Sequence, residues 1–191
     1  MRIGVISEDK TDYDAIDILI KKITSDSVNT IGSYGMGKAD IIHKKKKHSD
    51  KLFNFNCDFV IIVRDSDGAE ISPIEDQISA AYDDTRIGSI YKTCIAIQEI
   101  ESWFLADLGC IRKLYNIPLN SKRITQNNTD DVIDPKEVLK SYVEKWTDGE
   151  NSHVQSDSKL LAENLDINKA STNSKSFLDF KNIVMAIAAN S

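Results

Sequence analysis

Two aspartates separated by one residue follow the abrupt end of an apolar run, Val60-Ile61-Ile62-Val63-Arg64-Asp65-Ser66-Asp67-Gly68. A run of this length indicates a strand buried on both faces, so Asp65 and Asp67 are expected at its carboxyl end. Open α/β sheets bind ligands at that edge. Two carboxylates held this close repel each other unless a cation, a proton or a hydrogen-bond donor compensates them. The pair therefore suggests a divalent metal site.

Further acidic residues follow the ends of other predicted strands. Glu8 comes directly after the first one, and Asp12 lies on the same face if a helix begins between them. Because parallel strands place their carboxyl ends on one edge of the sheet, these side chains are expected to converge. Hard oxygen ligands without a supporting His or Cys favour Mg²⁺ or Mn²⁺ over zinc. The candidate metal ligands are Glu8, Asp12, Asp65, Asp67, Glu99 and Glu101.

Predicted strands and helices alternate through roughly the first 108 residues. This order favours an α/β fold with a mainly parallel four-stranded sheet flanked by helices. The predicted strands are Arg2 to Ser7, Ser27 to Ser33, Asp58 to Arg64 and Lys92 to Gln98, and the predicted helices are Tyr13 to Thr24, Lys38 to Leu52 and Ile74 to Tyr82.

Residues 109–191 have a different pattern, which predicts a helical annex packed on the 1–108 domain. Trp103, in a short helix before the annex, is expected to anchor the annex to the sheet. The segment Leu119 to Pro135, rich in Asn, Asp, Ser and Thr, is expected to be a loop. The predicted annex helices are Ile111 to Tyr115, Lys136 to Trp146, Lys159 to Leu165 and Ser176 to Ala189.

Composition narrows the class of protein. The chain has 191 residues, 41% hydrophobic and 28% charged, which suits one domain with a small appendage. No apolar stretch approaches the about 18 residues that span a bilayer, and the chain enters directly into a predicted strand, so we expect a cytoplasmic protein without membrane contact. Three unpaired cysteines predict buried reduced thiols. A net charge of −6 argues against a surface coated in positive charge, yet leaves a nuclease open.

Three motifs can be compared with known domains: Glu8-Asp9-Lys10-Thr11-Asp12, the turn Gly35-Met36-Gly37-Lys38, and Asp65-Ser66-Asp67-Gly68. Together they resemble the TOPRIM domain of topoisomerases, bacterial primases and OLD-family nucleases. The segments Glu99 to Asp107 and Ser174 to Phe177 are similar to a small bacterial TOPRIM-like family of unknown function. The resemblance covers the first 108 residues well and the remainder loosely.

The resemblance implies hydrolysis of a nucleic-acid phosphodiester with Mg²⁺ or Mn²⁺, in a bacterial defence system. Glu8, Asp65 and Asp67 would be the catalytic residues, and Lys38 would meet a substrate phosphate. Asp9 stands where the family has a glycine, which adds charge and removes backbone freedom. No tyrosine lies in a topoisomerase context, so the nuclease branch fits better.

Other interpretations of the same residues stay open. The segment Asp65 to Gly68 is also typical of a turn. Acidic residues are also favourable at helix N-termini, which is an alternative role for Glu8, Asp12, Glu99 and Glu101. A strand followed by Asp-x-Asp-Gly also resembles haloacid-dehalogenase-like phosphatases, with Asp65 as the nucleophile. A third alternative is a non-catalytic TOPRIM-like binding module beside a partner ATPase, since the chain itself contains no Gly-x-x-x-x-Gly-Lys-Ser/Thr loop.

Overall fold

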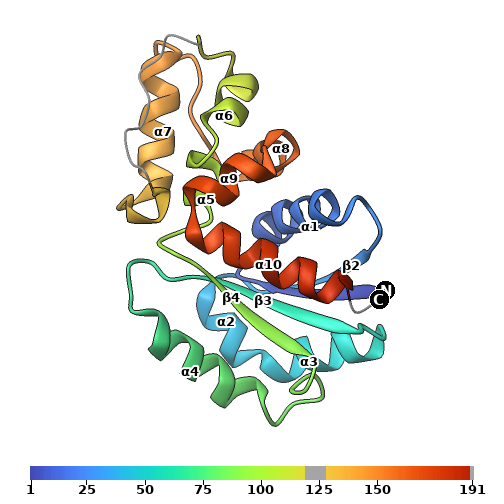
Figure 1. Cartoon of the computed structure of the whole chain (residues 1–191). Helices are drawn as coiled ribbons and strands as arrows, with labels where there is room; N and C mark the ends of the chain where they lie inside the picture. Colours follow the sequence, from blue (N-terminus) through green and yellow to red (C-terminus); the bar gives the residue numbers. More distant parts are fainter. Residues whose placement is uncertain (119–127, 190–191) are drawn as a thin grey trace.

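A computed structural model describes residues 1–118 and 128–189. Its centre is a sheet of four strands in the order β2-β1-β3-β4, and every neighbouring pair is parallel (Figure 1). The predicted α/β class and the four-stranded parallel sheet are therefore confirmed. The strands are β1 (Arg2–Ser7), β2 (Asn29–Tyr34), β3 (Phe59–Asp65) and β4 (Tyr91–Ala96).

The two central strands are the most apolar. Five of the six residues of β1 are buried, and so is the run Val60 to Val63 of β3. Strand β2, at one edge, is mostly polar and only one of its residues is buried. Each central strand has a neighbour on both sides and a helical layer on both faces, so burial of its apolar residues selects the centre of the sheet.

Helices cover both faces of the sheet (Figure 1). Successive residues of β1 point to opposite faces, so Val5 packs with the helices on one side and Ile6 with those on the other. The first layer contains α1 (Lys10–Thr24) and α10 (Lys175–Ala189), and the second contains α2 (Lys38–His43), α3 (Lys45–Asn54) and α4 (Ile71–Tyr82).

The predicted single helix from Lys38 to Leu52 was wrong, because this segment forms two helices. Lys44 is the boundary residue, with φ −101° and ψ 19°. The Asp40 carbonyl, in the first turn of α2, accepts from the Lys44 amide at 2.9 Å and also contacts His48 Nε2 at 3.2 Å. The Asp40 carbonyl thus has two contacts, one from the residue at the boundary and one from a side chain of the next helix.

The C-terminal part of the chain is helical, as expected. The predicted loop from Leu119 to Pro135 lies outside the described residues as far as 127. Pro135 itself opens a helix, and the helix α9 had not been predicted. The elements are α5 (Glu101–Leu105), α6 (Leu108–Tyr115), the 3-10 helix η1 (Thr129–Asp131), α7 (Pro135–Trp146), the 3-10 helix η2 (Gln155–Asp157), α8 (Ser158–Asn164) and α9 (Ile167–Asn173).

Trp103 joins these helices to the sheet layer. Its ring is fully buried, stacks on Phe180 at 5.1 Å and meets the edge of Phe177 at 5.5 Å. Its indole Nε1 donates to Ser176 Oγ at 2.9 Å. One apolar core runs from β1 through Trp103 to α10, so buried side chains cross residue 108 without interruption. The division into domains at that residue stays a prediction.

The three cysteines Cys57, Cys94 and Cys110 are buried and form no disulfide, so their expected burial is confirmed. Within residues 1–118 and 128–189, no helix has the length and apolar character needed to cross a membrane.

Replacing Trp103 with Ala is expected to lower the free energy of unfolding by about 3–5 kcal/mol, because it removes two ring contacts and leaves a cavity. Chemical denaturation followed by circular dichroism measures this loss. Trp146→Ala, at a partly exposed position of α7, is the matched control and should cost clearly less. Equal losses in the two variants would contradict the anchoring role of Trp103.

Candidate active site

The carboxyl ends of β1 and β3 bring Glu8 and Asp65 together. The strands are parallel neighbours, with Ile6 opposite Ile62, so both chains leave the sheet at one edge. Glu8 Oε1 accepts the backbone amide of Asp65 at 3.2 Å, and Asp65 Oδ1 accepts the amide of Ile100 at 3.1 Å. The two carboxylates thus link the ends of three strands at the edge where α/β sheets bind ligands.

Asp65 lies at the centre of a group of acidic side chains. Its pKa is raised well above the usual value, first because the carboxyl is withdrawn from solvent and then because Asp12 and Glu8 repel its charge. Glu101 and Asp67 add further repulsion. Burial likewise raises the pKa of Glu8, against a hydrogen bond from Asp65 that lowers it. These carboxylates are close enough for the charge of one to oppose ionisation of the next.

Asp12 belongs to the same group. It is buried in the first turn of α1, and its pKa is raised to about 7, chiefly by burial and then by repulsion from Asp9 and Glu101. Glu8 contributes a smaller repulsion. We refer below to Glu8, Asp12, Asp65 and Glu101 as the inner carboxylates.

Asp67 lies outside this inner group and has its own partner. Its backbone is left-handed at φ 48°, its amide donates to Gln98 at 2.8 Å, and Gly68 follows at φ 75°. The side chain is turned to an exposed position, where Lys38 Nζ lies 2.5 Å from its Oδ2. The predicted metal ligand Asp67 and the predicted phosphate ligand Lys38 are therefore paired with each other.

The turn before α2 brings Lys38 to this edge. Gly37 has φ 124°, a conformation that side chains rarely adopt, and its amide donates to the Glu8 carbonyl at 3.0 Å. The glycine turn predicted from sequence thus closes against the end of β1 and places Lys38 beside the acidic group.

Glu99 has a structural task. Its Oε2 accepts the amide of Lys136 at 3.0 Å, in the first turn of α7. Burial raises the pKa of Glu99, and this hydrogen bond acts against the rise. The helix N-terminal interpretation therefore has support for Glu99, although the helix that it caps is remote in sequence.

Asp9 caps α1. Its Oδ1 accepts the amides of Thr11 at 2.7 Å and Asp12 at 3.1 Å, and Gln155 donates to its other oxygen at 2.7 Å. Burial acts to raise the pKa of Asp9, but these hydrogen bonds together outweigh it and lower the pKa. The backbone of Asp9 is extended at φ −143°, a conformation open to any residue. The expected loss of glycine freedom therefore has no consequence at this position.

Sequence reasoning missed His153, which lies between α7 and η2. Its side chain is only 1% exposed, and Nε2 lies 3.9 Å from Glu101 Oε1. No hydrogen-bond partner for Nε2 is found among the described residues. A single histidine in a polar segment carries no spacing signal, and the fold alone brings it to the acidic edge.

The donor chemistry of this edge fits a hard divalent cation, because several carboxylates share it and burial opposes their ionisation without one. Among residues 1–118 and 128–189, however, no three His, Cys, Asp or Glu side chains already surround one point. Binding of an ion at this edge would require side chains to turn.

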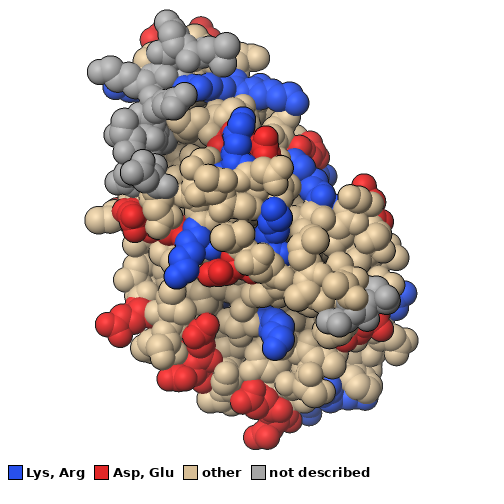
Figure 2. Space-filling view, viewed as in Figure 1, with Lys and Arg blue, Asp and Glu red and all other residues tan. Residues whose placement is uncertain are grey.

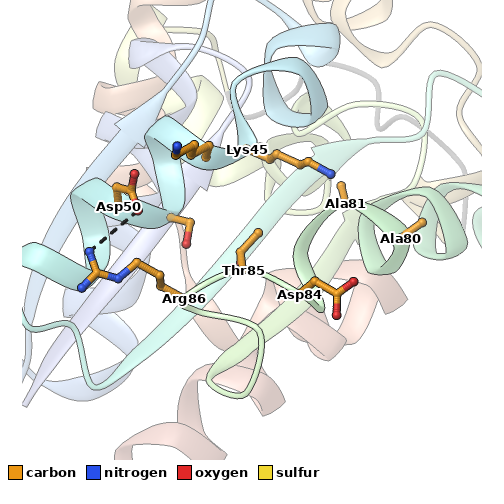
Figure 3. Close-up of a pocket in the computed structure, with 9 residues that line it drawn as sticks. Lys45, Asp50, Ala80, Ala81, Asp84, Thr85 and Arg86 are labelled. Atoms are coloured by element: carbon orange, nitrogen blue, oxygen red, sulfur yellow. Dashed lines mark ion pairs between the residues drawn. The ribbon is translucent and has the colours of Figure 1, made fainter.

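A separate pocket of about 410 Å³ lies in the second helical layer, between α3 and the end of α4 (Figure 3). Its lining includes Lys45 and Asp84, and Asp50 faces Arg86 at 3.8 Å on one side. Basic and acidic side chains are also interspersed over the face in Figure 2. This pocket contains none of the inner carboxylates.

Comparison with known proteins gives no relative: no family model, no curated protein and no solved structure matches this chain.

Asp12→Asn is expected to stabilise the metal-free protein at high pH. Because the pKa of Asp12 rises from 3.8 to about 7 on folding, the folded state binds more protons than the unfolded chain within this window. The cost of burying a charged Asp12 beside other carboxylates is thus absent below this pH window, grows within it and is complete above it. We expect a gain of roughly 1–3 kcal/mol at about pH 8 and almost none at about pH 4.

Chemical denaturation at these two pH values measures the effect. Asp76→Asn, on the exposed surface of α4, is the matched control and should change stability little at either pH. Loss of stability in Asp12→Asn at high pH would contradict a destabilising buried charge at this position.

Proposed function

We propose that this protein is a metal-dependent nuclease that hydrolyses phosphodiester bonds at the carboxyl edge of the sheet. The observation that carries the proposal is the group of inner carboxylates, which repel one another at the ends of β1 and β3 and at the start of α5. A protein retains such repulsion at a cost in stability, and perturbed carboxylates at a sheet edge are typical of functional sites. The TOPRIM resemblance of the same residues supports the same chemistry.

Asp65 and Glu8 would hold the cation, with Asp12 and Glu101 as further ligands. A divalent ion there would neutralise the scissile phosphate and lower the pKa of the attacking water. Glu8 is half-buried and its pKa is raised, so it is suited to accept a proton from that water. Asp67 and Lys38, both partly exposed, stand at the outer side of the group.

Lys38 gives the site a phosphate contact. Its ammonium is exposed and already pairs with an oxygen anion, Asp67 Oδ2. A substrate phosphate can replace that carboxylate, which frees Asp67 to turn toward the cation. In a chain with a net charge of −6, a local contact of this kind suits nucleic acid better than a broad basic surface does.

The phosphatase alternative needs an ionised Asp65 as nucleophile. The Ile100 amide already donates to Oδ1, so one oxygen of that nucleophile is occupied. The alternative also gives no task to Glu8 or Asp12. The nuclease interpretation uses all of these groups.

Asp65→Asn is expected to reduce Mn²⁺-dependent cleavage of DNA or RNA by roughly 10²-fold or more, because it removes a charge that holds the cation. A fluorescent oligonucleotide assay measures the rate, and Asp76→Asn serves as the exposed control. An unchanged rate in Asp65→Asn removes this residue from the mechanism. Turnover of phosphate monoesters without nuclease activity favours the phosphatase, and Mn²⁺ binding without either activity favours a binding module.

Lys38→Ala is expected to raise KM for the oligonucleotide by roughly ten-fold, because one charge-assisted contact with phosphate is lost. Mn²⁺ affinity should stay the same or increase, since Asp67 loses its ion pair. Lys45→Ala, at the start of α3, is the matched control for the loss of one exposed lysine. An unchanged KM for Lys38→Ala argues that Lys38 only pairs with Asp67.

A further inference from the structure

His153 brings a nitrogen donor to the acidic edge from the C-terminal part of the chain. The imidazole is buried, and its Nε2 has no hydrogen-bond partner among the described residues. Glu101 Oε1 lies 3.9 Å from Nε2, which is too far for a hydrogen bond. A buried nitrogen left without a partner is costly, so its position beside a carboxylate needs an explanation.

Tyr115 fixes which nitrogen carries the hydrogen. The Tyr115 hydroxyl donates its single hydrogen to Asp157 Oδ2 at 2.7 Å, so it can only accept from His153 Nδ1, which lies 3.0 Å away. In the neutral ring Nε2 therefore presents a lone pair toward Glu101. A hydrogen bond from the other ring nitrogen to an oxygen, backed by a carboxylate, is how proteins orient an imidazole that binds a metal.

The separation of the two groups suits a shared ion. Small divalent metal ions bind nitrogen and oxygen ligands at roughly 2.0–2.2 Å, so two ligand atoms on one ion lie about 3 to 4 Å apart. The distance from His153 Nε2 to Glu101 Oε1 falls within this range. Asp12 is the candidate third donor, because it lies in the first turn of α1, and the cap of that helix, Asp9, accepts a hydrogen bond from Gln155, two residues after His153.

We propose that His153 Nε2, Glu101 and Asp12 form a mixed nitrogen–oxygen cation site on the annex side of the inner carboxylates. This inference rests on the proposed function, because it specifies one of the ions that the nuclease would use. An imidazole ligand shifts the preference of a site from Mg²⁺, which prefers oxygen alone, toward transition-metal ions, and Mn²⁺ is the spectroscopic probe for them. His153 lies in the segment between α7 and α8, so this segment would help to determine which metal ion binds.

The same segment is already fixed against the acidic edge. Gln155 donates to Asp9 Oδ2 at 2.7 Å, two residues after His153. Asp157 accepts from Tyr115 and also from the Val154 amide at 3.2 Å. These contacts hold His153 in place before any ion arrives, so the cost of ordering it is met during folding.

Electron spin echo envelope modulation of the full chain with one equivalent of Mn²⁺ tests this site, because the method detects the ¹⁴N nucleus of a coordinated imidazole. We expect ¹⁴N modulation in the unchanged protein and in His43→Gln, an exposed histidine on α2, and its loss in His153→Gln. His153→Gln should also lower Mn²⁺ affinity by roughly ten-fold and change Mg²⁺ affinity little.

Bound Mn²⁺ without ¹⁴N modulation, or modulation that persists in His153→Gln, overturns the mixed site and leaves the nuclease proposal standing if Asp65→Asn still abolishes cleavage. No Mn²⁺ binding at all overturns both. Should His153→Gln fail to fold, His43→Gln combined with His48→Asn leaves His153 as the one imidazole, since the chain has three histidines. Retained modulation then supports the site and its loss overturns it.

Discussion

Repulsion between carboxylates at one edge of a parallel sheet is the constraint on which the rest of this structure depends. Parallel strands end together, so acidic residues that follow β1 and β3 must share one region of low solvent access. The outer members have separate partners: Asp67 pairs with Lys38, Glu99 meets the N-terminus of α7, and Asp9 caps α1. The inner carboxylates are left to repel one another, which is the condition that a bound cation would relieve.

The C-terminal helices serve this edge in two ways. Trp103 and α10 extend the core of the sheet into the helical part, so the segment that follows α7 has a fixed place. That segment then reaches back, with Gln155 on Asp9 and His153 beside Glu101. A part of the chain that is distant in sequence therefore forms one wall of the candidate site. This arrangement explains why buried polar groups occur in the annex as well as at the strand ends.

The α/β architecture could be predicted because burial on two faces leaves a strong signal. The runs ending at Ser7 and Asp65 need apolar residues throughout, and the acidic residues after them could be placed at one edge from strand direction alone. The break at Lys44 could not be predicted, because the residues on both sides of it follow a helical pattern. The role of His153 could not be predicted, because it depends on a contact with Glu101, which is far away in the chain. The ion pairs could not be predicted either, because nothing in the spacing of Asp67 and Lys38 shows that they meet.

The most direct test of a cation-binding edge is anomalous diffraction from a crystal soaked in Mn²⁺. The account predicts an anomalous peak bonded to oxygen atoms of Asp65 and of Glu8 or Asp12, with those side chains turned toward it. Full Mn²⁺ occupancy elsewhere on the protein, with no peak at the ends of β1 and β3 and unchanged side chains there, would contradict the account.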